Sequence, residues 1–344
     1  MIAATFEEVR SRHSATVENL ADIIIGLRQI EEFKLQLSSS TPLNHDDNDS
    51  TETSTTRTII DTNLVDSFLK DRLGIQLLCD HYVAIDKYAK KRNPAKIGGG
   101  ISVNCNFMDV LNDAILEAKH VCDANLGTAP EVYVVYDNNN ETLINSGLID
   151  DAMIRLTLIR PWVHHVLVET LKNAMSSNVE KFLQNDTIDN SDNNASSSTT
   201  INQPPNIYVR IHDSDESLTC EIMDQGVGLT DVSGVTHEDD KFEKVFQFAF
   251  STSRQRWDRL DEQQSYAMVR SPLGSLGVGL TLSRMMIQMF GGDLFLSPRS
   301  NGYIIECDND EESKDQSIVL ESGCTATIVL NRDPTILEWD QSQV

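Results

Sequence analysis

Residues 165–174 read HVLVETLKNA, a stretch whose apolar residues predict a buried helix although four of its side chains are polar. Side chains four residues apart lie on the same face of a helix, so His165, Glu169 and Asn173 form one polar row. Lys172 lies one step beside this row. Two interpretations are open: a solvated helix face tied by weak ion pairs, or a set of functional groups on a buried helix. Motifs elsewhere in the chain bear on that choice.

Composition sets limits on the class of protein. The chain has 344 residues, which makes two domains the simplest expectation. Hydrophobic residues make up 40% and charged residues 24%, as in globular proteins. The formal net charge of -25 argues against a general nucleic-acid binder and against binding to an anionic membrane surface, because both need basic patches. A nucleotide site in this chain therefore needs local positive potential from backbone amides, a lysine and a metal ion.

The cysteines and the N-terminal residues indicate the compartment. The cysteines are scattered without a close C-x-x-C pair, which fits neither a zinc site nor a disulfide scaffold, so we expect reduced thiols inside the cell. They are Cys79, Cys105, Cys122, Cys220, Cys307 and Cys324. No apolar run reaches the length of a membrane span. Residues 1–20 contain Glu7, Glu8 and Glu18 and resemble neither a secretory signal nor an acid-poor transit peptide, so we expect targeting information to be absent or removed.

The first hundred residues are predicted to form a helical bundle. In residues 5–35, apolar side chains recur mostly at intervals of three, four and seven, which is the spacing of one buried stripe. Residues 38–57 have almost no large apolar side chains and are expected to form a mobile loop. A second long helix is predicted over residues 64–83, and Pro94 with the glycines at 98–100 ends its pattern. Long helices joined by loops favour a bundle over residues 1–100.

After Gly100 the pattern becomes mixed and predicts an α+β fold. Helices are expected at 107–125, 161–183 and 279–290, and strands at 131–135, 207–211, 218–222 and 324–330. The two alternating runs at 207–211 and 218–222 predict an antiparallel pair. A second polar, low-complexity insert, residues 185–205, precedes this pair. Helices packed on a sheet around one core then form a sandwich.

Two glycine motifs are candidates for ligand loops. Asp224-x-Gly226-x-Gly228 follows a predicted strand, and Gly277-Val278-Gly279-Leu280 precedes a predicted helix. Each motif is either ordinary turn chemistry or a loop that binds a ligand. Glycine before a helix lets backbone amides approach a phosphate, and an aspartate at the end of a strand can accept a hydrogen bond from the amine of adenine. The phosphate loop G-x-x-x-x-G-K-[ST], the dinucleotide fingerprint and the motifs of ordinary protein kinases are all missing from the sequence.

The order of these motifs resembles the Bergerat ATP-binding fold of the GHKL superfamily. The pieces are Glu169-Thr170-Leu171-Lys172-Asn173-Ala174, Asp224 to Gly228, Gly277 to Leu280 and Gly323-Cys324-Thr325. Within that superfamily the chain resembles the mitochondrial α-keto acid dehydrogenase kinases. The further matches are Arg10 to His13, residues 68–78 (FLKDRLGIQLL) with His81, Phe250 to Ser253, and Ser283-Arg284.

The resemblance implies a domain order and a role for each motif residue. It implies an N-terminal helical bundle over 1–100, shortened at its start, an ATP-binding α/β sandwich over 101–335 with a lid near 229–275, and a tail over 336–344. Glu169 would be the general base, His165 would hydrogen-bond Glu169, Lys172 would supply positive charge near the phosphates, and Asn173 would hold Mg²⁺. Asp224 would contact adenine with support from Thr325. The remaining nucleotide contacts would come from Gly226, Gly228, Ser251, Thr252, Gly277, Val278, Gly279 and Leu280.

The resemblance also implies a reaction and partners. The expected protein is an ATP-dependent protein serine kinase of the mitochondrial matrix that phosphorylates, and so inactivates, the E1α subunit of a pyruvate or branched-chain dehydrogenase complex. ATP and Mg²⁺ would be its cofactors. An E2 lipoyl domain would be its scaffold, it would form a homodimer, and it would neither bind nucleic acid nor insert into a membrane. The motifs do not distinguish the pyruvate complex from the branched-chain complex.

Two other classes of protein stay open, together with a plainer interpretation of two histidines. A two-component histidine kinase shares the ATP site, but His81 lacks the acidic residue that follows a phosphorylated histidine, so we interpret His81 as structural. The alternative for His165 is an ordinary, partly buried histidine. A non-catalytic adaptor that binds a lipoyl domain is the other class. Ser275, which replaces the first glycine of G-x-G-x-G, favours the adaptor, whereas Glu169 and Asn173 argue against it.

Overall fold

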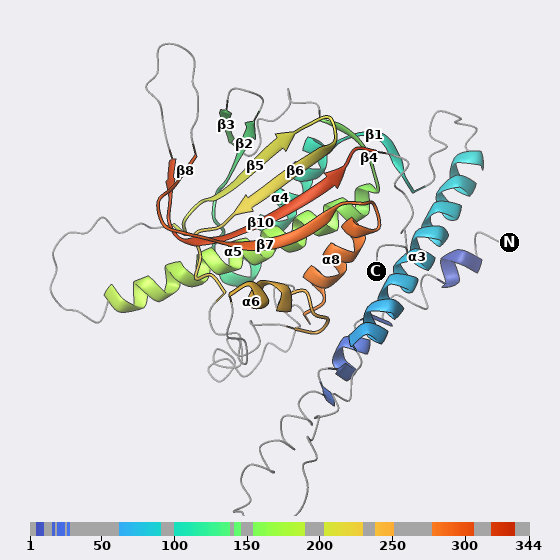
Figure 1. Ribbon diagram of the computed structural model, residues 1–344, viewed down its shortest axis with the longest axis horizontal. Coiled ribbons are helices and arrows are strands. Elements are labelled where there is room, and N and C mark those ends of the chain that lie inside the picture. The colour runs from blue at the N-terminus through green and yellow to red at the C-terminus, as the bar shows by residue number, and fades with distance from the viewer. Residues whose placement is uncertain are drawn as a thin grey trace, which may run out of the picture.

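A computed structural model defines two parts of the chain, a helical N-terminal region and a mixed α/β region (Figure 1). It describes residues 5–9, 16–17, 19–24, 26–27, 62–90, 100–137, 141–145, 154–189, 203–229, 238–250, 277–305 and 318–333. The expected loop at 38–57, most of the expected lid and the tail lie outside these residues. The predicted order, a helical region followed by a mixed α/β region, is confirmed.

A six-stranded mixed sheet is the centre of the α/β region, with the strand order β3-β2-β5-β6-β10-β7. The strands are β2 (Val132–Asp137), β3 (Glu141–Asn145), β5 (Ile207–Asp213), β6 (Ser217–Met223), β7 (Asp293–Arg299) and β10 (Gly323–Asn331). The predicted pair is confirmed, because β5 and β6 run antiparallel with Tyr208 opposite Met223 and Asp213 opposite Leu218. Strands β2 and β5 are parallel, which makes the sheet mixed.

Two small two-stranded sheets flank the central one. Strand β1 (Ser102–Asn106) pairs with β4 (Arg155–Leu158), and β8 (Tyr303–Ile305) pairs with β9 (Ile318–Leu320). The β8–β9 pair lies at one end of the central sheet in Figure 1. Its buried side chains Ile305 and Leu320 form a second, small apolar cluster with side chains of β2, β5 and β6.

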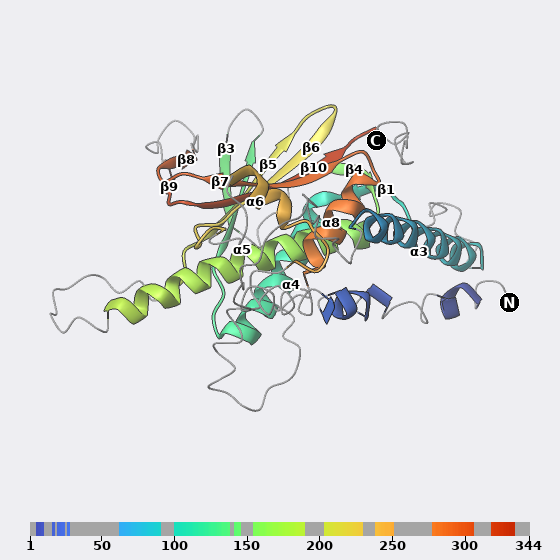
Figure 2. The same cartoon turned by 60° about the horizontal axis from the view of Figure 1, so that its bottom comes forward.

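Helices cover one face of the central sheet, as Figure 2 shows. They are α4 (Phe107–Leu126), α5 (Arg160–Asp189) and α8 (Gly279–Gln288). Local chemistry sets the ends of α4. The side chain of Asn106 accepts a hydrogen bond from the amide of Met108, and Gly127 closes the helix with φ 74° and a bond from its amide to the Asp123 carbonyl. The predicted helices at 107–125 and 279–290 are therefore confirmed within a few residues.

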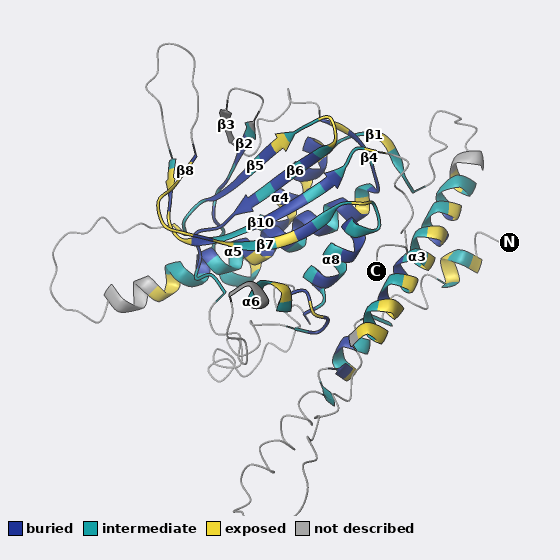
Figure 3. Cartoon of the chain, viewed as in Figure 1, coloured by how far each residue is buried: buried dark blue, intermediate teal, exposed yellow. Residues whose placement is uncertain are grey.

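The core lies between these helices and the sheet (Figure 3). On β6, Leu218, Cys220 and Ile222 are buried, whereas the alternate residues Thr219 and Glu221 are partly exposed. This alternation is the one expected of a strand with one face on a core. Helix α5 runs longer than predicted, to Asp189, and so enters the segment expected to be an insert at 185–205.

The helical N-terminal region joins the same core. Helix α3 (Thr62–Lys90) buries Leu69 and Leu73 in the main apolar cluster, together with Ala21 and Ile24. Other apolar side chains of α3 lie on its solvent side, and Leu78 is 69% exposed. Among the described residues, no helix combines the length and the apolar character needed to cross a lipid bilayer.

Candidate functional site

The polar row on α5 contains a buried ion pair. The Lys172 ammonium donates to Glu169 Oε1 at 2.6 Å, and the two side chains are only 11% and 13% exposed. Replacing a buried ion pair by apolar side chains is often neutral or stabilising, so stability alone does not explain this pair. A solvated helix face is therefore the wrong interpretation for Glu169 and Lys172. Asn173, one residue further on, is exposed.

His165 lies on the same helix, one turn before Glu169. Burial lowers the pKa of its imidazole, an effect that the nearby Glu169 carboxylate opposes. Its buried Nε2 has no hydrogen-bond partner among the described residues. The expected hydrogen bond from His165 to Glu169 is not among the contacts of the described chain, where Lys172 donates to Glu169 instead. The short i, i+3 reach of the lysine side chain allows this pairing.

The start of α8 lies directly against the Glu169 carboxylate. A methyl group placed on Gly279 would overlap Glu169 Oε2, so only glycine permits this close approach. Val278 precedes the helix and makes no side-chain cap. The first amides of a helix have no acceptor within the helix, and such amides bind anions well. The structure therefore brings Gly279, in the first turn of α8, next to Glu169, although more than a hundred residues separate them.

Thr281, on the first turn of α8, was not a predicted site residue. It is 2% exposed, and its Oγ1 lacks a hydrogen-bond partner within the described residues. A lone threonine in a helix has no distinctive sequence pattern, so sequence reasoning had no signal for it.

Asp224 lies at the end of β6 and is nearly completely buried. Its Oδ1 accepts hydrogen bonds from the amides of Gly226, at 2.9 Å, and Cys324, at 3.1 Å. Burial raises the pKa of the carboxyl group, whereas these two amides and the charges of Arg299 and Lys181 oppose that shift. Both described hydrogen bonds to the carboxylate use Oδ1.

The loop after Asp224 packs on α5. The amide of Val227 donates to Ser177 Oγ at 3.1 Å, and a methyl group on Gly226 would overlap that same side chain. The Asn178 side chain also accepts from the amide of Gln225 at 2.8 Å. Helix α5 thus carries Glu169 and Asn173 at its centre and holds the Asp224 loop two turns further on.

Thr325 lies opposite Met223 in the β10–β6 ladder, close to Asp224. No described hydrogen bond joins its side chain to the Asp224 carboxylate, which is bonded by the amide of Cys324. The Thr325 hydroxyl accepts instead from Arg299 at 3.3 Å. Of the other predicted residues, Gly228 lies in the Asp224 loop, whereas Ser251 and Thr252 lie outside the described residues.

His81 has a structural contact. Its Nδ1 accepts a hydrogen bond from the amide of Gly100 at 3.2 Å, at the junction between the helical region and β1. This contact fits the structural interpretation of His81, because its Nδ1 is already used to hold the backbone at Gly100.

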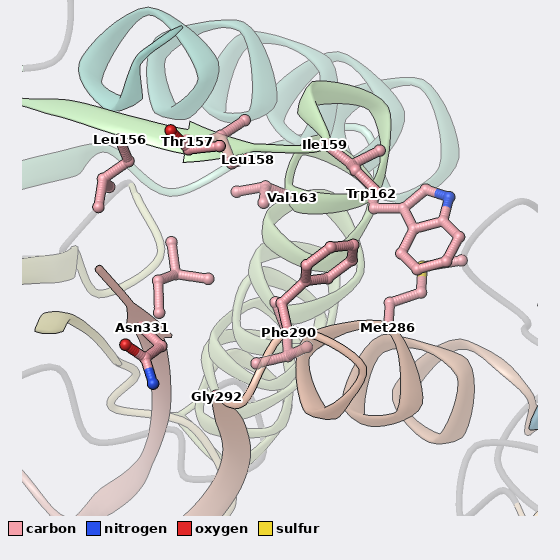
Figure 4. A pocket seen from close by; sticks show the side chains of 12 residues that line it. Leu156, Thr157, Leu158, Ile159, Trp162, Val163, Met286, Phe290, Gly292 and Asn331 are labelled. Carbon is pink, nitrogen blue, oxygen red and sulfur yellow. The ribbon is translucent and has the colours of Figure 1, made fainter. Parts of the chain in front are cut away.

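A small apolar cavity lies apart from these residues, at the beginning of α5 and the end of α8 (Figure 4). Its volume is about 30 Å³. Trp162, Phe290 and Met286 line it, with Leu156 and Leu158 of β4. None of the residues that line it is titratable, so this cavity is not where acid–base chemistry would take place.

Comparison with known families identifies the α/β region. Residues 159–334, just over half of the chain, match the family described as histidine kinase-, DNA gyrase B- and HSP90-like ATPase. The chain belongs to this ATPase family. The match contains α5, the Asp224 loop, α8 and β10, which are the elements that form the site.

Individual relatives of this chain share a common name. Pyruvate dehydrogenase (acetyl-transferring) kinase isozyme 4 from Mus musculus is 27% identical over 302 residues, which cover 87% of this chain and 58% of the relative. Isozyme 1 from Homo sapiens is 25% identical and the kinase from Arabidopsis thaliana 24%; each match covers 67% of this chain. Those matches cover 45% and 52% of the relatives. The chain thus spans about half the length of the relatives it matches.

Proposed function

We propose that this ATPase is an ATP-dependent protein serine kinase that phosphorylates, and so inactivates, the E1α subunit of a mitochondrial α-keto acid dehydrogenase complex. The observation that carries the proposal is the buried Glu169–Lys172 pair against the first turn of α8. It places a carboxylate, an ammonium group and free helix amides together, which is the set that phosphoryl transfer needs. The names of the relatives support the kinase assignment.

Adenine recognition would fall to Asp224. Its Oδ1 is held by two amides, and the carboxylate is thereby oriented to accept a hydrogen bond from the exocyclic amine of the base. Gly226, Gly228, Gly277 and Gly279 would keep the backbone close to the nucleotide. Val278 and Leu280 would contact it from the start of α8. Thr325 would act indirectly, through Arg299, and Ser251 and Thr252 are proposed contacts from the lid.

Asn173 would hold Mg²⁺ through its amide oxygen. The residues fit the ion, because Asn173 is exposed on the face that carries Glu169, and an amide oxygen is a suitable ligand for a hard cation. Mg²⁺ binds few protein ligands directly and takes the rest from phosphates and water, so one protein oxygen is enough. When bound, the ion would neutralise charge on the phosphates.

Glu169 would act as the general base on the attacking serine hydroxyl. The Lys172 ammonium, which pairs with Glu169, would also attract the phosphates of the nucleotide. The backbone amides at the start of α8 would stabilise the negative charge that develops on the phosphates. His165, neutral through burial, would adjust the basicity of Glu169 without carrying charge itself. Each of these residues would act by positioning groups or by electrostatic stabilisation, and these are the two main contributions to catalysis of phosphoryl transfer.

Location and partners follow from the same proposal. We place the kinase in the mitochondrial matrix, with an E2 lipoyl domain as its scaffold and a second copy of the chain as its dimer partner. The helical bundle would span 1–100 and the ATP-binding domain 101–335. The names of the relatives include the word mitochondrial, which supports the compartment.

Transfer of labelled phosphate tests the proposal. Purified E1 subunits of the pyruvate and branched-chain complexes are incubated with γ-labelled Mg-ATP and wild type, Glu169→Gln or Glu180→Gln. Glu180 lies on α5 beyond the site and contacts Gln184, so it is the matched control. We expect acid-stable serine labelling that Glu169→Gln abolishes and Glu180→Gln leaves intact. The labelled subunit then identifies the substrate.

Two results would contradict the kinase proposal. Nucleotide binding without labelling of either E1 subunit would favour the adaptor. An acid-labile phosphohistidine on this chain would indicate a histidine kinase.

A further inference from the structure

Arg299, the last residue of β7, is a buried arginine beside Asp224. It is 8% exposed, and its guanidinium donates to four different groups. Nη1 donates to the Cys324 carbonyl at 3.2 Å and to Thr325 Oγ1 at 3.3 Å. Nη2 donates to the Asp224 carbonyl and, at 3.1 Å, to the Glu321 carbonyl. One side chain thus ties the end of β6 to the start of β10.

Arg299 bonds the backbone of Asp224 and of Cys324, one of the two residues whose amides hold the Asp224 carboxylate. The Cys324 amide donates to Asp224 Oδ1, and the Asp224 amide donates to the Cys324 carbonyl at 3.0 Å. Arg299 bonds that same Cys324 carbonyl and the Asp224 carbonyl. A displacement of the guanidinium would therefore change the angle at which the carboxylate faces a ligand.

A second layer connects this network to the β8–β9 pair. The Glu321 amide donates to Gln225 Oε1 at 3.0 Å, next to Asp224. Lys181 of α5 donates to Glu321 Oε2 at 2.7 Å and to the Gln225 carbonyl at 2.9 Å. Glu321 follows β9 directly, so the Asp224 loop is bonded both to α5 and to the residue that follows β9.

We propose that Arg299 is a positioning residue for nucleotide recognition: it does not touch the nucleotide but orients the Asp224 carboxylate through the Asp224 and Cys324 backbone. The inference rests on the proposed function, in which Asp224 contacts adenine. A hydrogen bond to a charged group is stronger than a neutral one, and a buried carboxylate needs such compensation to stay charged. A neutral side chain at position 299 would remove both the orientation and the charge.

Several charged or titratable groups near Asp224 affect its pKa. Burial raises the pKa of Asp224, and the positive charges of Arg299 and Lys181 act against that rise. The pKa of the Cys324 thiol is raised to about 12, so the thiol stays neutral between pH 5 and 8 and does not titrate with Asp224. The Glu321 carboxylate is paired with Lys181. Removing the Arg299 charge therefore raises the pKa of Asp224 further.

Nucleotide binding by purified variants of the full chain tests the role. The dissociation constants of Mg-ATP and Mg-GTP are measured from pH 5 to 8 for wild type, Arg299→Met, Arg299→Lys and Arg332→Met. Adenine presents an amine where guanine presents an acceptor, so the ratio of the two constants reports the Asp224 contact. Arg332 is the control, because its guanidinium likewise bonds a backbone carbonyl, that of Arg155, and pairs with the Asp213 carboxylate at the far end of the sheet from Asp224.

We expect Arg299→Met to weaken Mg-ATP binding by about tenfold or more, since several charge-assisted hydrogen bonds are lost. The preference of this variant for ATP over GTP should fall. As the pH is lowered from 8 to 5, its affinity for Mg-ATP should begin to decline at a higher pH than that of wild type. Arg299→Lys keeps the charge, so it should weaken binding less and retain the wild-type pH profile. Arg332→Met should match wild type.

Unchanged affinity, base preference and pH profile in Arg299→Met would overturn the inference, and so would an equal loss in Arg332→Met. If circular dichroism shows that Arg299→Met does not fold, Arg299→Lys decides: wild-type affinity overturns the inference, and weaker binding with an unmoved pH profile supports it. Absence of Mg-ATP binding by folded wild type would instead refute the proposed function itself, and this inference with it.

Discussion

At the scale of single residues, the Glu169–Lys172 pair has the largest energetic consequence. Each side chain is almost fully removed from water and each is the partner of the other at 2.6 Å. Taking two charges out of water costs several kcal/mol per ion before their attraction is counted. The pair is therefore tolerable only while both members are present, which makes it a sensitive probe of the site.

Lys172→Met should destabilise the fold by about 3 kcal/mol, because it leaves the Glu169 carboxylate buried and unpaired. The double variant Glu169→Gln, Lys172→Met should recover most of that loss, since no buried charge is left. Urea denaturation of wild type, the two single variants and the double variant measures the coupling. Additive losses in the double variant would show that the pair is not coupled.

His165 should make stability depend on pH. Its pKa is lowered by burial, so below pH 6.5 the unfolded chain takes up a proton more readily than the folded one. The stabilising contribution of the neutral imidazole is complete above pH 6.5 and is lost as the pH falls towards the folded pKa. His165→Gln should therefore lose less stability than wild type between pH 7.5 and 5.5. The urea midpoints of wild type and His165→Gln at the two pH values test this prediction. An equal loss of stability in the two proteins would contradict it.

At the scale of elements, α5 and α8 meet at the candidate site by close approach, and no hydrogen bond between described residues joins the two helices. Gly279 lets the first turn of α8 lie against Glu169, and the Asp224 loop packs on Ser177 of the same α5. Arg284 of α8 then bonds Glu243 of α6 (Glu238–Lys244) and Asp293 of β7, with its guanidinium 4.6 Å from the Phe246 ring centroid. Helix α8 is thus held by α6 and β7 through Arg284, while no described side chain caps its N-terminus.

Gly279→Ala should displace the Glu169 carboxylate and weaken Mg-ATP binding by about tenfold or more, because its methyl group overlaps Glu169 Oε2. Gly74→Ala on α3 is the control, since a methyl group there meets nothing within 4 Å. That substitution should leave binding unchanged and stabilise the helix by up to about 1 kcal/mol. Calorimetric titration of both variants measures the difference, and equal affinities would show that the approach of α8 does not matter.

At the scale of the whole molecule, the helical N-terminal region and the α/β region share one core. Leu69 and Leu73 of α3 belong to the same apolar cluster as α4, α5 and the sheet. Among the described residues, the cations Lys172 and Arg299 are also buried and Lys181 is partly buried, although the formal net charge of the whole chain is -25.

A shared core predicts that the two regions unfold together. Leu69→Ala should lower the free energy of unfolding by about 2–5 kcal/mol and shift a single transition, because Leu69 is 1% exposed. Leu78→Ala on the same helix, where the side chain is 69% exposed, should change it by less than about 0.5 kcal/mol. Circular dichroism during thermal and urea unfolding reports both values. Two separate transitions, with only the first moved by Leu69→Ala, would show independent domains.

The sequence by itself determined the local elements and the motif residues of this protein. Periodicity predicted the helices at 107–125 and 279–290 and the β5–β6 pair, because side-chain spacing directly reflects which face of an element is buried. Motif order also pointed to Glu169 and Asp224 as members of one ATPase site. The length of α5 and the parallel pairing of β2 with β5 were not predicted, since both depend on neighbours far along the chain.

Only the tertiary structure decided how those residues meet. It paired Glu169 with Lys172 rather than with His165, bonded Asp224 through the Cys324 amide rather than through Thr325, and buried Arg299 beneath that carboxylate. No local pattern marks Arg299, because an arginine at the end of a strand normally faces water. Its role arises from strand register, which brings Asp224, Arg299 and Cys324 together although up to 100 residues separate them. Contacts of this kind follow from packing, and packing exists only in the folded chain.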